Sequence, residues 1–107
     1  MSADGPVRIA AIEAGGTKMI AALCDADGRP LEQVRIATRD PQATLAEVRD
    51  FLDAAQRRHG TAHACGVASF GPLTLDPRAA DFAHLRRTPK AGWSGTDLRT
   101  MLPEGLR

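Results

Sequence analysis

Three short apolar runs around a single amphipathic segment constrain the fold of this chain more than any other feature. Residues 7–12, 19–24 and 64–69 are composed mainly of small or β-branched apolar side chains, which is typical of strands buried on both faces of a sheet. In residues 31–38 a period of two predicts a strand with one face towards solvent. The two alternating sets are Leu31, Gln33, Arg35 and Ala37, and Glu32, Val34, Ile36 and Thr38. Because short turns join the first three strands along the chain, we expect an antiparallel meander.

A helix is predicted over residues 40–59, where apolar side chains recur along one face. Asp40 suits the N-cap, Pro41 suits the first helical position and Gly60 suits the C-terminal end. Residues 44–47 have the spacing of a capping box, which offers an alternative start one turn later. A strand that follows a helix favours parallel pairing, so the whole pattern predicts an α/β fold.

The composition excludes several classes of protein. The chain has 107 residues and a formal net charge of +1, which allows one domain and argues against a nucleic-acid surface. We expect no membrane partner, because no run is long enough to span a bilayer and the start lacks a signal-peptide pattern. Both cysteines lie in apolar runs, which favours the cytoplasm. His63 and Cys65 offer only two metal ligands, so no bound metal is expected.

The stretch IEAGGTKMIA places two glycines between the first two predicted strands. One interpretation is a type I′ hairpin turn, in which both central residues take positive φ. The other is an anion-binding turn, in which the N–H groups of Gly15 and Gly16 and the hydroxyl of Thr17 donate to a phosphate. Lys18 would add positive charge. The carboxylate of Glu13, just before the turn, is suited to magnesium.

The stretch AAIEAGGTKMIAAL resembles the first phosphate motif of the ROK family of bacterial sugar kinases. Two later stretches, GVASFGPLTLDP at residues 66–77 and TPKAGWSGTDL at residues 88–98, are similar to the fructokinase branch of that family. Most of the family begins the first motif with aspartate, and the glutamate at Glu13 is similar to that branch. The three stretches keep the family's order over almost the whole chain.

The resemblance implies two actin-like (ribonuclease H-like) domains, with ATP, Mg²⁺ and the sugar meeting in the cleft between them. It implies that the ATP phosphates bind at Gly15, Gly16, Thr17 and Lys18, with Glu13 near the magnesium. The residues that it places on the sugar side are Gly71, Pro72, Thr88, Pro89, Lys90, Gly92 and Trp93. Trp93 has an alternative role, which is to cover the edge of the core.

The resemblance also implies that the catalytic aspartate, the zinc site and the adenine-binding half of the family follow later than residue 107. We therefore expect residues 1–107 to be a partial N-terminal domain, with no second domain and no catalytic residue of its own. The family role is ATP-dependent phosphorylation of a hexose, with fructose as the acceptor, but this chain alone is expected to be inactive. The alternative is a non-enzymatic remnant or interaction module. The full-length form is expected to be a homo-oligomer.

Overall fold

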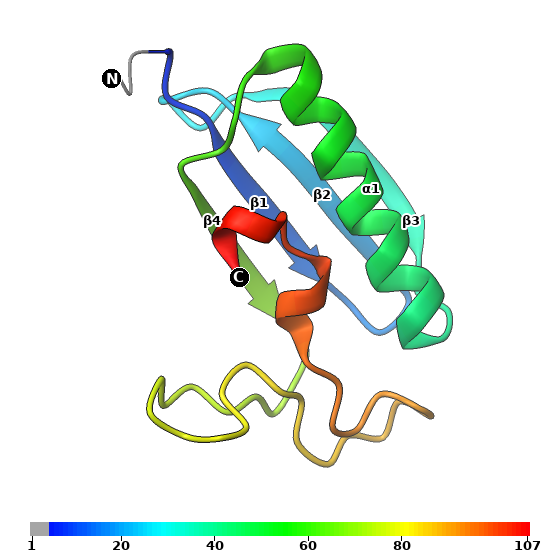
Figure 1. Cartoon of the computed structure of the whole chain (residues 1–107). Helices are drawn as coiled ribbons and strands as arrows, with labels where there is room; N and C mark the ends of the chain where they lie inside the picture. Colours follow the sequence, from blue (N-terminus) through cyan, green and yellow to red (C-terminus); the bar gives the residue numbers. More distant parts are fainter. Residues whose placement is uncertain (1–4) are drawn as a thin grey trace.

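The computed structural model describes residues 5–107 as a four-stranded sheet with one long helix on it (Figure 1). The elements follow the chain as β1 (Ile9–Ala14), β2 (Lys18–Cys24), β3 (Pro30–Ala37), α1 (Pro41–His59) and β4 (Ala64–Ser69). Two short 3₁₀ helices, η1 (Leu98–Met101) and η2 (Glu104–Leu106), end it. The sheet order is β3-β2-β1-β4. The meander is antiparallel and β4 is parallel to β1, so the predicted α/β fold class is confirmed.

The first strand lies two residues later than predicted. It begins at Ile9 rather than residue 7, and Val7 is 46% exposed. It ends at Ala14, which is paired with Met19 of β2 and Ser69 of β4. Pairing on both sides therefore extends the strand past Glu13, a residue that the apolar pattern could not include.

The predicted helix start at Asp40 is confirmed. The Asp40 carboxylate accepts a hydrogen bond from the backbone N–H of Ala43 at 3.0 Å, and Pro41 is the first helical residue. The alternative start at Thr44 is wrong, because this residue is buried inside the helix. Its hydroxyl oxygen instead accepts from the backbone N–H of Arg39 at 2.8 Å, an N–H that precedes the helix. Gly60 ends the helix with φ 108°, a value that favours glycine.

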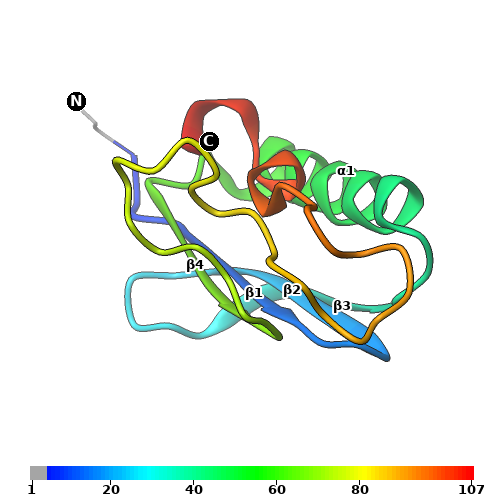
Figure 2. The ribbon, with the colours of Figure 1, turned by 90° about the horizontal axis from the view of Figure 1, so that it is seen from below.

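All the covering elements lie on one face of the sheet (Figure 2). The buried side of α1, including Val48 and Leu52, packs with Ile12, Met19 and Ile36 in the core cluster. Each such side chain contributes roughly 1.5–3 kcal/mol when it is fully buried. The core therefore fixes which residues of each strand face the helix and which face the opposite side.

The opposite face of the sheet is uncovered over residues 5–107, as expected for a chain with one long helix. It carries a shallow hollow of about 490 Å³, lined mainly by small side chains. The prediction that residues 64–69 are buried on both faces is wrong. β4 is an edge strand in this structure; its residues 64, 66 and 68 lie exposed on the uncovered face, and Val67, on the helix side, is still 41% exposed.

The segment between β4 and η1 has no regular element. Within it, an isolated antiparallel bridge joins Leu73 and Leu85. Asp97 caps η1 by accepting from the backbone N–H of Arg99 at 3.0 Å. Within residues 5–107, no helix is both long and apolar enough to cross a membrane.

We expect the purified chain to self-associate through its uncovered sheet face. The free energy gained by burying roughly 400 Å² of apolar surface, at about 25 cal/mol per Å², is comparable to the whole free energy of unfolding of a small domain. Light scattering and binding of a hydrophobic dye measure this. Ala68→Lys, on the uncovered face, should reduce both signals, whereas Gln42→Lys, at the exposed start of α1, should leave them unchanged. A monodisperse wild-type chain that binds no dye would contradict the expectation.

Candidate functional site

The glycine turn and the Gly71–Pro72 segment, which are far apart in the sequence, meet at one edge of the sheet. β1 and β3 are both antiparallel to β2, and β4 is parallel to β1, so these three strands point the same way. Their carboxyl ends therefore lie at the same edge, which is the lower edge in Figure 1. In open α/β sheets, ligands bind in the crevice beyond such ends. The glycine turn follows β1 there, and the Gly71–Pro72 segment follows β4.

The glycine turn is a two-residue hairpin centred on Gly16 and Thr17. The backbone N–H of Gly15 donates to the carbonyl of Lys18 at 3.0 Å. Neither Gly15 nor Gly16 has positive φ, so the type I′ interpretation is wrong. Close approach explains the first glycine instead, because a Cβ at Gly15 would lie 2.7 Å from the carbonyl oxygen of Lys18.

The second glycine leaves open space above the turn. A Cβ at Gly16 would meet nothing within 4 Å. The backbone N–H groups of Gly16 and Thr17 have no acceptor among residues 5–107, and both Thr17 and Lys18 are exposed. Two neighbouring free amides beside a lysine are suited to an anion such as a phosphate.

Glu13 lies on the uncovered face of the sheet. It is paired with Ile20 of β2 on one side and with Ala68 of β4 on the other, and it is exposed. Lys18 and Ile20 lie on the same face of β2, since alternate residues of a strand share a face. An exposed carboxylate one strand away from a lysine, beside a turn with free amides, fits a magnesium ion that accompanies a phosphate.

The Gly71–Pro72 segment is tied to the start of the turn and to the following loop. The backbone N–H of Phe70 donates to the carbonyl of Ala14 at 2.8 Å. The Gly71–Pro72 peptide is cis, and the carbonyl of Pro72 accepts from the N–H of Arg86 at 2.8 Å. These bonds connect the two segments that the resemblance assigns to the sugar side, because Arg86 leads into the second of them.

The loop over residues 88–93 closes on itself. The backbone N–H of Thr88 donates to the hydroxyl of Ser94 at 3.0 Å, and the N–H of Trp93 donates to the carbonyl of Lys90 at 3.2 Å. Pro89 and Gly92 are exposed, and Thr88 and Lys90 are half-buried. The loop therefore presents polar and backbone groups at the surface.

Trp93 is fully buried, which agrees with its alternative role in the core. Its indole N–H donates to the carbonyl of Arg39 at 2.8 Å. Its ring packs edge-to-face against that of Phe70, with centroids 5.7 Å apart. Trp93 thus anchors the loop beneath the surface, and its ring faces protein rather than solvent.

Thr38 belongs to the site but was not predicted from the sequence. The residue follows β3 and makes two hydrogen bonds to the glycine turn: its backbone N–H donates to the carbonyl of Thr17 at 2.9 Å, and its hydroxyl donates to the carbonyl of Gly15 at 2.7 Å. The only signal in the sequence was a threonine at the end of an alternating run, which is ordinary for a strand.

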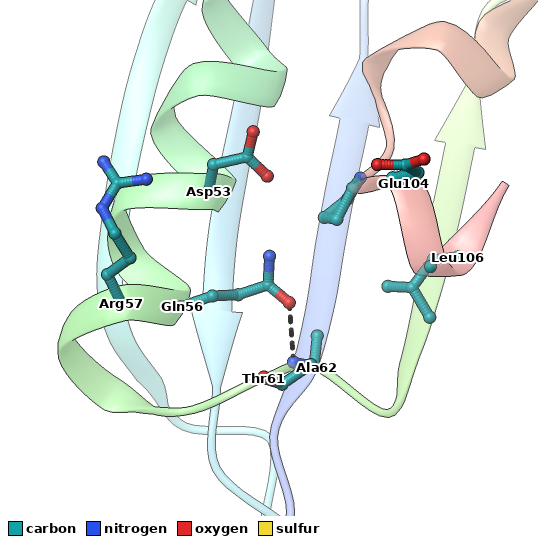
Figure 3. Close-up of a pocket in the computed structure, with 9 residues that line it drawn as sticks. Asp53, Gln56, Arg57, Thr61, Ala62, Glu104 and Leu106 are labelled. Carbon is teal, nitrogen blue, oxygen red and sulfur yellow. Dashed lines mark hydrogen bonds between the residues drawn. The ribbon is translucent and has the colours of Figure 1, made fainter.

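A second hollow, of about 460 Å³, lies away from this edge, between the C-terminal half of α1 and η2 (Figure 3). Asp53, Arg57 and Glu104 line it, and the side-chain oxygen of Gln56 accepts from the backbone N–H of Ala62 at 2.8 Å. Over residues 5–107, no three His, Cys, Asp or Glu side chains gather as a metal site. This hollow shares no lining residue with the glycine turn.

Comparison with known proteins decides the family. The sequence model of the ROK family matches residues 9–107. The chain belongs to the ROK family.

Its relatives include fructokinases. The fructokinase of Zymomonas mobilis is 38% identical over 96 residues, which cover 89% of this chain and 32% of that protein. The fructokinase of Lactococcus lactis subsp. cremoris is 32% identical over 95 residues, which cover 89% and 31%. This ROK chain therefore spans about a third of the length of the curated relatives that it matches.

A ROK family glucokinase from Streptomyces griseus, solved in complex with glucose and AMPPNP, has the same fold. The TM-score is 0.68 at 21% identity, over 90% of this chain and 31% of the glucokinase. The actin-like fold that the resemblance implied is thereby confirmed. The meander, helix and parallel strand described above are this ROK chain's share of it.

We expect the two glycines of the turn to differ in their effect on stability. Gly15→Ala should lower the free energy of unfolding by about 1–3 kcal/mol, because the new Cβ would press on the Lys18 carbonyl. Gly16→Ala should change it by less than about 0.5 kcal/mol, because the site is open. Urea unfolding of the two variants measures the difference. Equal losses, or a larger loss for Gly16→Ala, would contradict this geometry.

Proposed function

We propose that this ROK chain supplies the phosphate-binding turn of an ATP-dependent sugar kinase whose acceptor is a hexose, with fructose as the first candidate. The observation that carries the proposal is the pair of free backbone N–H groups at Gly16 and Thr17, next to the exposed Lys18. They lie at the edge of the sheet where the Gly71–Pro72 segment also begins.

The relatives support the choice of reaction and sugar. Two relatives at 38% and 32% identity are fructokinases, and a family member of the same fold was solved with glucose and an ATP analogue. The chain covers only about a third of those proteins, so the kinase activity is part of our proposal.

The residues of the turn have distinct roles in this proposal. The amides of Gly16 and Thr17 would donate to phosphate oxygens, and Lys18 would offset their charge. Glu13 would hold Mg²⁺ directly or through water. When bound, ATP supplies the phosphoryl group that is transferred, and the protein contributes mainly position and electrostatic stabilisation.

The sugar side is assigned to exposed backbone and loop groups. Gly71 and Pro72 would face the sugar from the end of β4, and Thr88, Pro89, Lys90 and Gly92 would face it from the following loop. Trp93 acts in this proposal as the buried anchor of that loop, because its ring is fully enclosed. A hexose hydroxyl held by this loop would be oriented towards the phosphate turn.

The reaction also needs a base for the sugar hydroxyl, and Asp97 is unsuited to that role. Burial raises the pKa of Asp97, but the hydrogen bonds and charge of Arg99, together with the charge of His84, outweigh it and leave the pKa below its ordinary value. A carboxylate engaged by arginine in this way is a weak base. We propose that the base lies outside residues 1–107, as the resemblance implies.

A second candidate role is that of a non-enzymatic interaction module, which the uncovered sheet face favours. The two candidates differ at the glycine turn. Only the kinase proposal requires nucleotide to contact Gly16, Thr17 and Lys18. An interaction module would leave the turn without a ligand.

Enzyme assays test the kinase proposal. We expect the 107-residue chain to show no turnover with fructose or glucose, Mg²⁺ and ATP, because a positioned base contributes about 10²–10⁴-fold. A chimera in which this chain replaces the matching segment of the Zymomonas mobilis fructokinase should be active. In it, Lys18→Ala should lower kcat/KM for ATP by about 10- to 100-fold, the loss expected for a charge-assisted bond.

Two further variants make this assay specific. Gly16→Val should also impair use of ATP, because the new side chain would crowd the phosphate. The fold itself should tolerate this side chain, since Gly16 has no positive φ and a Cβ there would meet nothing within 4 Å. Lys90→Ala is the matched lysine control and should change KM for fructose rather than for ATP. An unchanged ATP dependence in both turn variants would contradict the proposed phosphate role of the turn. Turnover that stays with the purified 107-residue chain would contradict the proposal that the base lies outside it.

A further inference from the structure

A short series of hydrogen bonds from the residues after β3 holds the glycine turn in place. Thr38 holds the carbonyl of Thr17 through its backbone N–H at 2.9 Å and the carbonyl of Gly15 through its hydroxyl at 2.7 Å. The carbonyl of the next residue, Arg39, accepts from the indole N–H of Trp93 at 2.8 Å. The loop over residues 88–93 is therefore connected to the turn through one junction.

The series closes on the β4 side through Phe70. The ring of Phe70 packs edge-to-face on Trp93, at 5.7 Å between centroids and 67° between planes. Its backbone N–H donates to the carbonyl of Ala14 at 2.8 Å, just before the turn. Trp93 thus touches both of the segments that hold the turn.

Peptide planarity gives the hydroxyl of Thr38 a directional effect. The carbonyl of Gly15 and the N–H of Gly16 belong to one rigid peptide plane and point in opposite directions. A hydrogen bond that fixes this carbonyl therefore also fixes the direction of the free N–H of Gly16. The bond from the Trp93 indole to the Arg39 carbonyl is partly buried, and partial shielding from water strengthens it relative to an exposed bond.

We propose that Thr38 and Trp93 are positioning residues for the phosphate turn. Thr38 aims the N–H of Gly16, and Trp93 fixes the Thr38–Arg39 junction, so that phosphate at the turn changes the environment of the indole. The proposal rests on the function proposed above, since it takes the ligand of the turn to be a phosphate.

Amide hydrogen exchange of the 107-residue chain tests the connection without a ligand. The reporters are the backbone amides of Gly15 and Thr38, both of which donate within or to the turn. Trp93→Phe keeps an aromatic ring but removes the indole donor, and it should speed exchange at both reporters relative to the amides of α1. Thr38→Val should do the same, whereas Thr74→Val, which removes a hydroxyl bonded to Asp81, should not.

Binding of inorganic triphosphate with Mg²⁺ tests the positioning role. Trp93 is the single tryptophan of the chain, so its emission should change in a saturable way as triphosphate is added. Thr38→Val should weaken binding about three- to tenfold, which is the net worth of one hydrogen bond. Thr38→Ser restores the hydroxyl and should restore the affinity, and Thr74→Val should bind as the wild type does.

The outcomes separate the two proposals. Wild-type affinity in a folded Thr38→Val variant, or unchanged exchange at Gly15 and Thr38 in both variants, would overturn the positioning role and leave the proposed function standing. No binding of triphosphate by the wild-type chain would overturn the phosphate role of the turn, and the positioning role with it. Weaker binding in Thr38→Val that Thr38→Ser rescues would support both.

Discussion

Hydrogen bonding of β1 to two neighbours at once is the constraint on which the rest of this structure depends. All six residues from Ile9 to Ala14 pair with β2 on one side and with β4 on the other. The antiparallel pair can be joined by a tight turn, whereas the parallel pair needs a crossover, and α1 provides it. Because β1 and β4 point the same way, the glycine turn and the Gly71–Pro72 segment emerge at the same edge.

The elements could be predicted where local chemistry decides them. Asp40, Pro41 and Gly60 marked the ends of the helix, and the periods of the apolar residues marked the strands and the buried side of α1. The first strand was misplaced because Glu13 belongs to it, and only pairing with β2 and β4 shows that. The exposure of β4 depends on its place at the sheet edge, which its own residues do not record.

The candidate site was predicted in part, for a similar reason. Gly15 to Lys18 could be recognised as a turn able to hold an anion, but its conformation could not, since the close approach to the Lys18 carbonyl exists only in the folded hairpin. Thr38 was missed because its bonds to the turn join residues 23 apart in the chain. Trp93 was ambiguous in sequence, and burial against Phe70 identifies it as a core residue.

We propose that the free amides at the carboxyl end of β1 hold a phosphate. Titration of the ¹⁵N-labelled chain with Mg²⁺ and ATP, followed by the chemical shifts of its backbone amides, tests it most directly. We expect the largest shifts at Gly16 and Thr17, with smaller ones at Lys18. Shifts confined to other surfaces, such as the hollow beside Arg57 and Glu104, or no shifts at saturating nucleotide, would contradict it.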